Sequence, residues 1–591
     1  MRVLLDNFED FVTRYTNNLS LGGVFIQTGD PRPIGTQLRL EISLRGGELL
    51  IEARGEVAWV RRYDPDQPWR IPGMGIRFRK LTAASKAHIG DLLGLEISPE
   101  EVEITEDSAP KLSGPEAVRS VQPMVGLDVG SFGVRLGLVR GDELAMLIQE
   151  QPQEGEAAQG TPELPFPNAP RLAGRAMAQV DAKARRGVLT VAGWAGLRGR
   201  EMAADAARSA GLKVERLVGT AAAAAIGCYA GRDVSRRLLV YHLGRSGFEA
   251  AVIEAVGDVF EVRAMDVSSS ISGTAIDAKI TDHLKQYARG RKGMDIDFDH
   301  PEIAARLWAT AESVKRQLTS SANADISLLG LAHGEKTRSV DLTARMTRQT
   351  FETLIEDLVD SSLQMCDEVL AAVGLGADDI DEVLLSGGQV RTPMIAERVG
   401  VFADRAPTFA GSDPELAPLF GANRLAGALE RVDAVALVDV LPISLGWVRP
   451  DGEYEVLLPQ GTRLPRAAHR HASTVYENQE RIRIHLFEGE KNSARHNRHV
   501  GSWSLAQVPP GPPGRWRFAV RFELDTSGLL SVSAIDQGTG RAHPVVREAQ
   551  MDQSKALAAL RRDAMMRKKA LARPPKKGLD KFLDKIKKKP K

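Results

Sequence analysis

Two glycine-rich turns carry the residues best suited to chemistry. Residues 124–139, MVGLDVGSFGVRLGLV, and residues 238–255, LLVYHLGRSGFEAAVIEA, share one pattern of apolar strand, turn and second strand. Alignment of the two copies places Asp128 on His242, Gly130 on Gly244 and Gly133 on Gly247. Glycine turns let successive backbone N–H groups point at phosphate oxygens, and a carboxylate at the strand end would hold water around Mg²⁺. The repeat indicates a phosphate-binding cleft, although such turns are more often plain hairpins.

The segments around these turns predict an α/β domain. Apolar, strand-like runs alternate with helical stretches such as residues 199–212 and 301–318. In the second stretch four polar residues lie at i, i+3, i+4 and i+7, so that one helix face presents them together: Glu312, Lys315, Arg316 and Thr319. A solvated charged face would give the same pattern.

These segments, in order, resemble the DnaK-type (seventy-kilodalton heat-shock) chaperone family. The matching motifs are VGLDVGSFG, KVERLVGTAAAAAIG, LLVYHLGRSGFEAAVIEA, ISGTAID, AESVKRQLTS, LLSGGQVRTPM, DVLPISLGWV and FELDTSGLLSVSAIDQGTGR. The resemblance implies an actin-like (ribonuclease H-like) α/β nucleotide-binding domain followed by a β-sandwich that grips peptides.

The same resemblance implies ATP or ADP as a ligand, bound with Mg²⁺. The residues at nucleotide-contacting positions are Asp128, Gly130, Ser131, Gly244, Arg245, Gly247, Gly273, Glu312, Lys315, Arg316, Thr319, Gly387, Gly388 and Arg391. Asp128 would hold Mg²⁺ through water, and the four residues of the helix face would frame the adenine ring and ribose. We therefore expect adenosine recognition to be retained.

The half of the site that would split the nucleotide departs from the family. His242 stands where the resemblance implies a second Mg²⁺-facing carboxylate, and Thr220 where it implies a glutamate that orients water. Arg245 and Gly247 replace a glycine and a threonine. Because each lost acid–base or charge-stabilising group typically costs about 10² to 10⁴ in rate, we expect at most a slow ATPase.

Two alternatives stay open at this point. In the first, the chain is a fully active ATP-dependent chaperone, and Lys183 or His242 serves as a substitute catalytic residue; Lys183 is the only lysine between Asp128 and Lys213. In the second, the chain is a non-enzymatic scaffold with PilZ-dependent cyclic di-GMP signalling, and His242 is a structural residue in a site that binds nothing.

Four residues of the β-rich block match positions around the family's peptide cleft: Ile443, Leu445, Trp447 and Ile482. Trp447 is larger than the usual aliphatic residue, so it would partly fill the cleft. His469, Arg470 and His471 would make a loop of the cleft unusually polar. Each apolar residue alone is equally natural in a sandwich core. The partners implied are a client or partner polypeptide and a J-type co-chaperone.

The N-terminal residues predict a separate small β-barrel, because short strands with turn residues between them follow one another there. The barrel resembles a PilZ domain, in which an NxSxxG motif, here Asn18, Ser20 and Gly23, binds cyclic di-GMP together with an upstream RxxxR. No RxxxR is present, since only Arg2 and Arg14 precede the motif. We therefore expect a module for docking or regulation rather than a cyclic di-GMP site.

With 591 residues the chain is too long for a single core. The expected order is a PilZ-like β-barrel (1–98), an acidic linker (99–121), the actin-like domain (122–433) with a shortened lobe near 148–186, a hydrophobic interdomain linker (434–441), the β-sandwich (442–546), and a short helix with a basic tail (547–591).

Charge and cysteine content complete the expectations. Residues 551–591 hold 15 Lys and Arg against four Asp, a surplus of 11 positive charges in a chain whose net charge is +1. Such a tail is most often solvated, and otherwise binds an acidic partner or an anionic surface; no specific nucleic-acid site is indicated. Two cysteines and no long apolar run favour a cytoplasmic location.

Overall fold

A computed structural model shows how these segments are arranged. The structure describes residues 2–5, 19–20, 23–28, 32–33, 35–44, 49–61, 73–82, 85, 124–130, 133–140, 143–151, 168–180, 185–291, 296–331, 341–429, 435–449, 453–549 and 553–572. The described chain forms two compact units. The first comprises Met1–Pro442, Arg463–Arg466 and Thr526–Gly528, and the second comprises the rest from Ile443 onwards.

The N-terminal part is a six-stranded sheet. Its strands, in the order of pairing, are β1 (Arg2–Leu5), β4 (Gln37–Leu44), β5 (Leu49–Arg61), β6 (Gly73–Leu81), β3 (Gly23–Gln27) and β2 (Leu19–Ser20). Alternate residues along each strand point to one face, so that side chains such as Leu40 and Ile42 of β4 share one core. The four longer strands confirm the strands that the sequence predicts here.

Two further sheets form the core of the α/β region. In the first, the order is β11 (Lys213–Gly219), β10 (Arg186–Val191), β7 (Met124–Val129), β8 (Val134–Arg140) and β9 (Glu143–Glu150). In the second, it is β18 (Thr408–Phe409), β17 (Glu382–Ser386), β12 (Ser235–Leu243), β13 (Phe248–Val256), β14 (Val259–Ser268) and β19 (Ala436–Val438). Each sheet thus contains one of the glycine-turn hairpins, β7–β8 or β12–β13.

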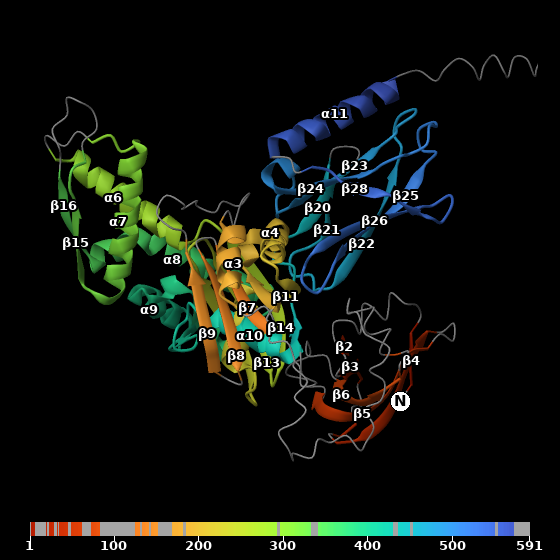
Figure 1. Ribbon diagram of the computed structural model, residues 1–591, viewed down its shortest axis with the longest axis horizontal. Helices are drawn as coiled ribbons and strands as arrows, with labels where there is room; N and C mark the ends of the chain where they lie inside the picture. Colours follow the sequence, from red (N-terminus) through yellow and green to blue (C-terminus); the bar gives the residue numbers. More distant parts are fainter. Residues whose placement is uncertain are drawn as a thin grey trace, which may run out of the picture. The chain divides into compact units, whose positions relative to one another are not determined.

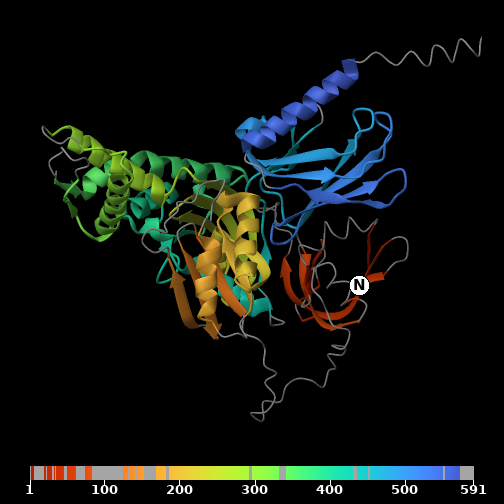
Figure 2. The ribbon, with the colours of Figure 1, turned by 45° about the horizontal axis from the view of Figure 1, so that its top comes forward.

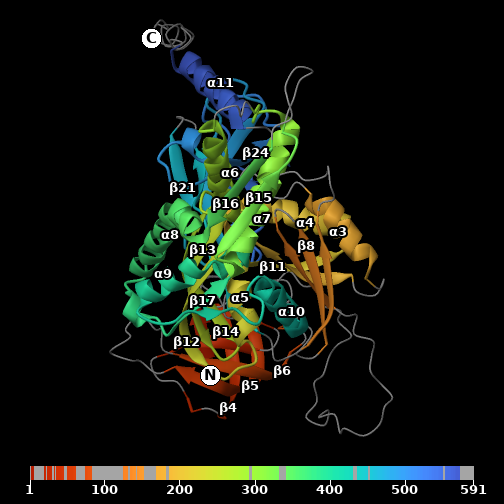
Figure 3. The same cartoon turned by 90° about the vertical axis from the view of Figure 1, so that its left-hand side faces the viewer.

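Helices α5 (Thr220–Tyr229) and α10 (Ala417–Leu429) lie between these two sheets (Figure 3). Their small residues let the helix backbones approach closely: a Cβ on Gly421 would lie 1.8 Å from the carbonyl oxygen of Ala223. The alanines of α5 join side chains of both sheets in one buried cluster. The contact brings the ends of the two hairpins close enough for Asp128 and Arg135 of the first to interact electrostatically with His242 of the second.

The remaining α/β elements form a helical lobe (Figures 1 and 2). Its elements are α6 (Gly273–Arg289), α7 (Pro301–Ser320), hairpin β15–β16 (Asn323–Leu328 and Leu342–Thr347), α8 (Arg348–Ala371) and α9 (Pro393–Ala403). Apolar residues at helical spacing on α7, among them Ile303, Leu307 and Leu318, are buried against α6 and α8. Helices α3 (Ala169–Ala178) and α4 (Gly196–Ser209) pack against strands of the first sheet.

The second unit is built from two antiparallel sheets and one helix. One sheet holds β21 (Tyr454–Leu458), β20 (Leu445–Val448), β23 (Ile482–Glu488), β24 (Arg498–Leu505) and β28 (Val545–Arg547), and the other holds β22 (Arg466–Ser473), β25 (Arg517–Leu524), β26 (Leu530–Asp536) and β27 (Ala542–His543). Helix α11 (Gln553–Ala572) follows. One prediction was wrong: His469, Arg470 and His471 lie in strand β22 and not in a loop.

No helix within the described ranges has the length and apolar composition needed to cross a lipid bilayer.

Candidate functional site

The two glycine turns close in the same way. In the first, the Gly130 N–H donates to the Gly133 carbonyl over 2.9 Å, and in the second the Gly244 N–H donates to the Gly247 carbonyl over 2.9 Å. Their cross-strand pairs differ, because Asp128 faces Arg135 while His242 faces Glu249. The two copies therefore keep one backbone shape but carry acid and base in opposite order.

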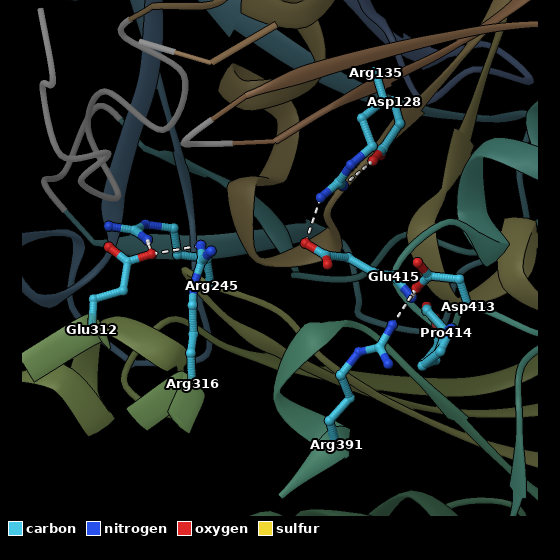
Figure 4. Close-up of polar contacts among 10 residues, drawn as sticks. Asp128, Arg135, Arg245, Glu312, Arg316, Arg391, Asp413, Pro414 and Glu415 are labelled. Carbon is cyan, nitrogen blue, oxygen red and sulfur yellow. Dashed lines mark hydrogen bonds and ion pairs between the residues drawn. The ribbon is translucent and has the colours of Figure 1, made fainter. Parts of the chain in front are cut away.

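Asp128 is held by two side chains at the end of β7. The Thr190 hydroxyl, from the neighbouring strand β10, donates to one carboxylate oxygen, and Arg135 Nη1 donates to the other over 3.1 Å. Arg135 Nη2 also donates to Glu415, over 2.5 Å, so that one guanidinium bridges two carboxylates (Figure 4). Burial alone would lower the pKa of Arg135, but the charges of Asp128 and Glu415 raise it.

His242 is a neutral residue of the second turn. Its Nδ1 lies 3.0 Å from the Ser386 hydroxyl, which in turn donates to the Pro414 carbonyl over 3.2 Å. Because the Ser386 hydroxyl donates its only proton to the Pro414 carbonyl, it can only accept a hydrogen bond from His242. Nδ1 therefore carries the imidazole hydrogen, and Nε2 is left as an acceptor. Burial lowers the pKa of His242 to about 4, with the Asp128 charge opposing this effect. The imidazole is therefore a weak base near neutral pH.

Two glycines of the site are required by their surroundings. Gly387 adopts φ +93°, and a Cβ there would lie 2.4 Å from the Leu243 carbonyl oxygen. At Gly247 a Cβ would lie 2.2 Å from the buried indole of Trp194. The threonine that the family resemblance implies at position 247 is thus excluded by Trp194. A hydroxyl at this place cannot be restored by one substitution.

The predicted adenosine face divides into a surface part and a buried part. Glu312 binds Arg245 over 2.7 Å and Arg316 over 2.8 Å (Figure 4), and although burial alone would raise the pKa of Glu312, Arg245 lowers it. Lys315 is only 3% exposed and pairs with fully buried Asp277 at 2.7 Å. The structure therefore brings Glu312, Arg245 and Arg316 together and assigns Lys315 to the core.

The other predicted residues of this side lie at the start of α6, near the end of α7 and in the turn Gly388–Arg391. Gly273 begins α6, where its N–H donates to the Gly244 carbonyl over 3.0 Å. The Thr319 hydroxyl donates to the Arg316 carbonyl over 2.7 Å. Arg391 lies in the turn after Gly388 and binds Asp413 over 2.8 Å (Figure 4).

Glu249 is a candidate functional residue that the sequence prediction missed. Its fully buried carboxylate accepts the Gly193 N–H over 2.7 Å and the Ala221 N–H over 3.1 Å. Burial raises its pKa to about 7, against these two hydrogen bonds. The carboxyl thus lies at the start of helix α5, next to Thr220. The position of Glu249 across from His242 in the hairpin is the sequence signal that would have found it.

A cavity of about 890 Å³ opens in the second unit. Trp447 and Ile482 line it, whereas Leu445 is fully buried, Ile443 is half-buried, and neither lines the cavity in the described structure. The Trp447 indole N–H donates to Glu455 over 3.2 Å, which fixes the ring at the wall. Leu560 of α11 also reaches the cavity.

Several predicted residues and segments lie outside the described residues: Asn18, Ser131, Lys183, the linker 99–121 and the tail 573–591. Of the NxSxxG motif, Ser20 and Gly23 are described as directly paired residues of strands β2 and β3.

Comparison with sequence models of protein families gave two matches. The Hsp70 protein model matches residues 170–576, which is more than half of the chain. The chain belongs to the Hsp70 family. The PilZ domain model matches residues 1–95. The chain is therefore an Hsp70-type chaperone, from a family of nucleotide-binding proteins, with an N-terminal PilZ module.

The Hsp70 match begins beyond the first glycine turn, which contains Asp128. Hsp70 proteins generally bind ATP or ADP with Mg²⁺, so the fit of Mg²⁺ to this site needs a test. Both oxygens of Asp128 already accept hydrogen bonds from Arg135 and Thr190, and the Arg135 guanidinium holds a positive charge against this carboxylate, which opposes a second cation there. Mg²⁺ prefers oxygen ligands and its own waters. The arrangement around Asp128 therefore does not fit a hydrated Mg²⁺ ion.

Proposed function

We propose that this Hsp70-type chain binds an adenine nucleotide between the two glycine turns, with slow or absent hydrolysis. The observation that carries the proposal is the contrast between the intact backbone closure of both turns and the changed charges beside them. Main-chain N–H donors hold phosphate oxygens whatever the side chains are. Hydrolysis depends on positioned charges, and here Arg135 bridges Asp128 to Glu415 while His242 is neutral.

We expect the same nucleotide site to contact the adenosine part of the ligand through Glu312, Arg245 and Arg316. Their ion pairs hold three side chains at one place on α7 and the second turn. A nucleotide ribose could accept and donate hydrogen bonds here in exchange for part of the Arg245 contact. Lys315 contributes by stabilising the helix through Asp277 rather than by touching ligand.

The second unit supplies the client-binding half of the proposal. The cavity is large enough for side chains of an extended polypeptide, its wall combines apolar Ile482 with polar neighbours, and Trp447 narrows it. The PilZ module, whose motif lacks the paired arginines, would serve for docking or regulation. The proposed domain boundaries are those expected from the sequence, with the linker segment 434–441 placing strand β19 on the edge of β14.

One experiment separates these functions. Calorimetric titration of the full chain with ADP and ATP tests binding, and a steady-state phosphate-release assay on the same sample tests turnover. We expect saturable binding and phosphate release near the uncatalysed background. Brisk release would refute the loss of hydrolysis, and the absence of any heat would refute nucleotide binding.

An active ATPase is the second candidate, and Glu249 favours it. A carboxyl with a pKa of about 7 near Thr220 has the protonation behaviour of a general base. If turnover is found, Glu249→Gln should lower it by about a hundredfold without changing ADP affinity. Equal turnover in Glu249→Gln and the parent chain would exclude this residue from catalysis.

A further inference from the structure

The position of Arg135 is set by strand pairing. Arg135 lies on β8 directly opposite Asp128 on β7, so the register of the hairpin places its guanidinium at the carboxylate. Only 19% of its side chain is exposed. Contacts to Asp128 at 3.1 Å and Glu415 at 2.5 Å hold it from two elements that are far apart in the sequence. Arg135 is therefore a fixed charge beside the first turn.

The charges around this turn favour an anionic ligand without a metal ion. A phosphate chain near a bare carboxylate is repelled unless a cation lies between them. Here the Arg135 charge already compensates Asp128, and the residue at the matching place in the second hairpin, His242, is an imidazole and not a carboxylate. Glu415, the other acceptor of Arg135, is 46% exposed, so solvent screens its charge.

The guanidinium also has the geometry for a phosphate. It presents its N–H groups in a planar fork that can bind two oxygens at once. Nη1 and Nη2 each use one contact on a carboxylate, while Nε is buried and has no hydrogen-bond partner among the described residues. A small rotation of the side chain would let it share a phosphate oxygen while keeping Asp128.

We infer that Arg135 is a built-in counter-ion, through which this chain binds the phosphates of an adenine nucleotide without a divalent cation. The inference rests on the proposed nucleotide binding between the two glycine turns. It explains why the carboxylate at position 128 is retained although the site does not fit hydrated Mg²⁺: Asp128 orients Arg135 rather than a metal ion.

The test is a titration of the full chain with ADP, once with excess MgCl₂ and once with excess EDTA. If metal and nucleotide binding are uncoupled at this site, linkage requires the two dissociation constants to agree within about twofold. Binding only in MgCl₂ would overturn the inference and leave the proposed nucleotide binding standing. Absence of binding in both buffers would overturn both.

A substitution then tests the residue itself. Arg135→Gln should weaken ADP binding in EDTA by roughly tenfold or more, the value of a charged hydrogen bond, and MgCl₂ should restore part of the loss because the Asp128 carboxylate is released. Arg345→Gln removes an arginine from an exposed pair with Asp325 and should leave both titrations unchanged. Arg135→Lys, with thermal melting as a check of folding, preserves the charge if Arg135→Gln does not fold. Equal affinity of the parent and folded Arg135→Gln in EDTA would overturn the role of this residue.

Discussion

His242 and Glu249 face each other across the second hairpin and titrate in opposite senses. Burial lowers the pKa of His242 from 6.5 to about 4, and it raises the pKa of Glu249 from 4.5 to about 7. Stability rises with pH where the unfolded chain binds more protons and falls where the native chain binds more. His242 therefore adds stability as the pH rises from about 4 to 6.5, whereas Glu249 removes stability as the pH rises from 4.5 to about 7.

The two effects are of similar size and nearly cancel in the parent chain. One pKa unit corresponds to about 1.36 kcal/mol, so the buried Glu249 accounts for about 3 kcal/mol and the half-buried His242 for about 2 kcal/mol. In His242→Gln the stabilisation that His242 adds as the pH rises is lost, so the free energy of unfolding should fall relative to the parent between pH 4 and 6.5. In Glu249→Gln the free energy of unfolding should rise relative to the parent between pH 4.5 and 7.

Urea unfolding followed by far-UV circular dichroism measures these free energies at a series of pH values. Taking the difference between each variant and the parent cancels the titration of all other groups. Glu397→Gln, which removes an exposed carboxyl on α9, is the control for the substitution itself. Slopes of the same sign in the His242 and Glu249 variants would refute the assigned burial of these two groups.

Three further changes test other features. Lys315→Met should lower the free energy of unfolding by about 3 to 5 kcal/mol because it leaves Asp277 buried and unpaired. Adding Asp277→Leu should recover most of this loss, and an unchanged urea midpoint in the single variant would contradict the buried pair. Trp447→Leu should widen the cavity and tighten binding of a fluorescent apolar peptide by about fivefold or more in an anisotropy titration; weaker binding would make the indole a client contact. Gly421→Ala, whose Cβ would overlap a carbonyl of helix α5, should lower the melting temperature, whereas Gly427→Ala on the same helix has open space and should not.

The local elements could be predicted from the sequence because their signals lie in neighbouring residues. The hairpin strands follow from short apolar runs around glycine, and α7 follows from its helical spacing of apolar residues. The assignment of residues 469–471 to a loop was wrong because it followed the family's peptide cleft and not the residues themselves. Strand β22 tolerates them, since its outward side chains are solvated.

The partners of the site residues were harder to predict, because they come from distant segments. Lys315 has the spacing of a surface residue, and only the position of α6 shows that Asp277 draws it inside. Arg135 could have been paired with Asp128 by counting across the hairpin, but its second partner, Glu415, follows it by 280 residues. Helix periodicity and turn composition carry no information on such contacts.

The matching closure of the two glycine turns has a consequence for how this protein can change. Each turn is shaped by a main-chain bond between its own glycines, at 2.9 Å in both cases, and substitution of the flanking acid or base does not touch that bond. The chemical reactivity of the flanking side chains can therefore change independently of the backbone shape of the turns. Hydrolysis can therefore be lost through side-chain substitutions while the backbone conformation that binds the ligand is kept. The substituted positions can then serve in sensing or regulation.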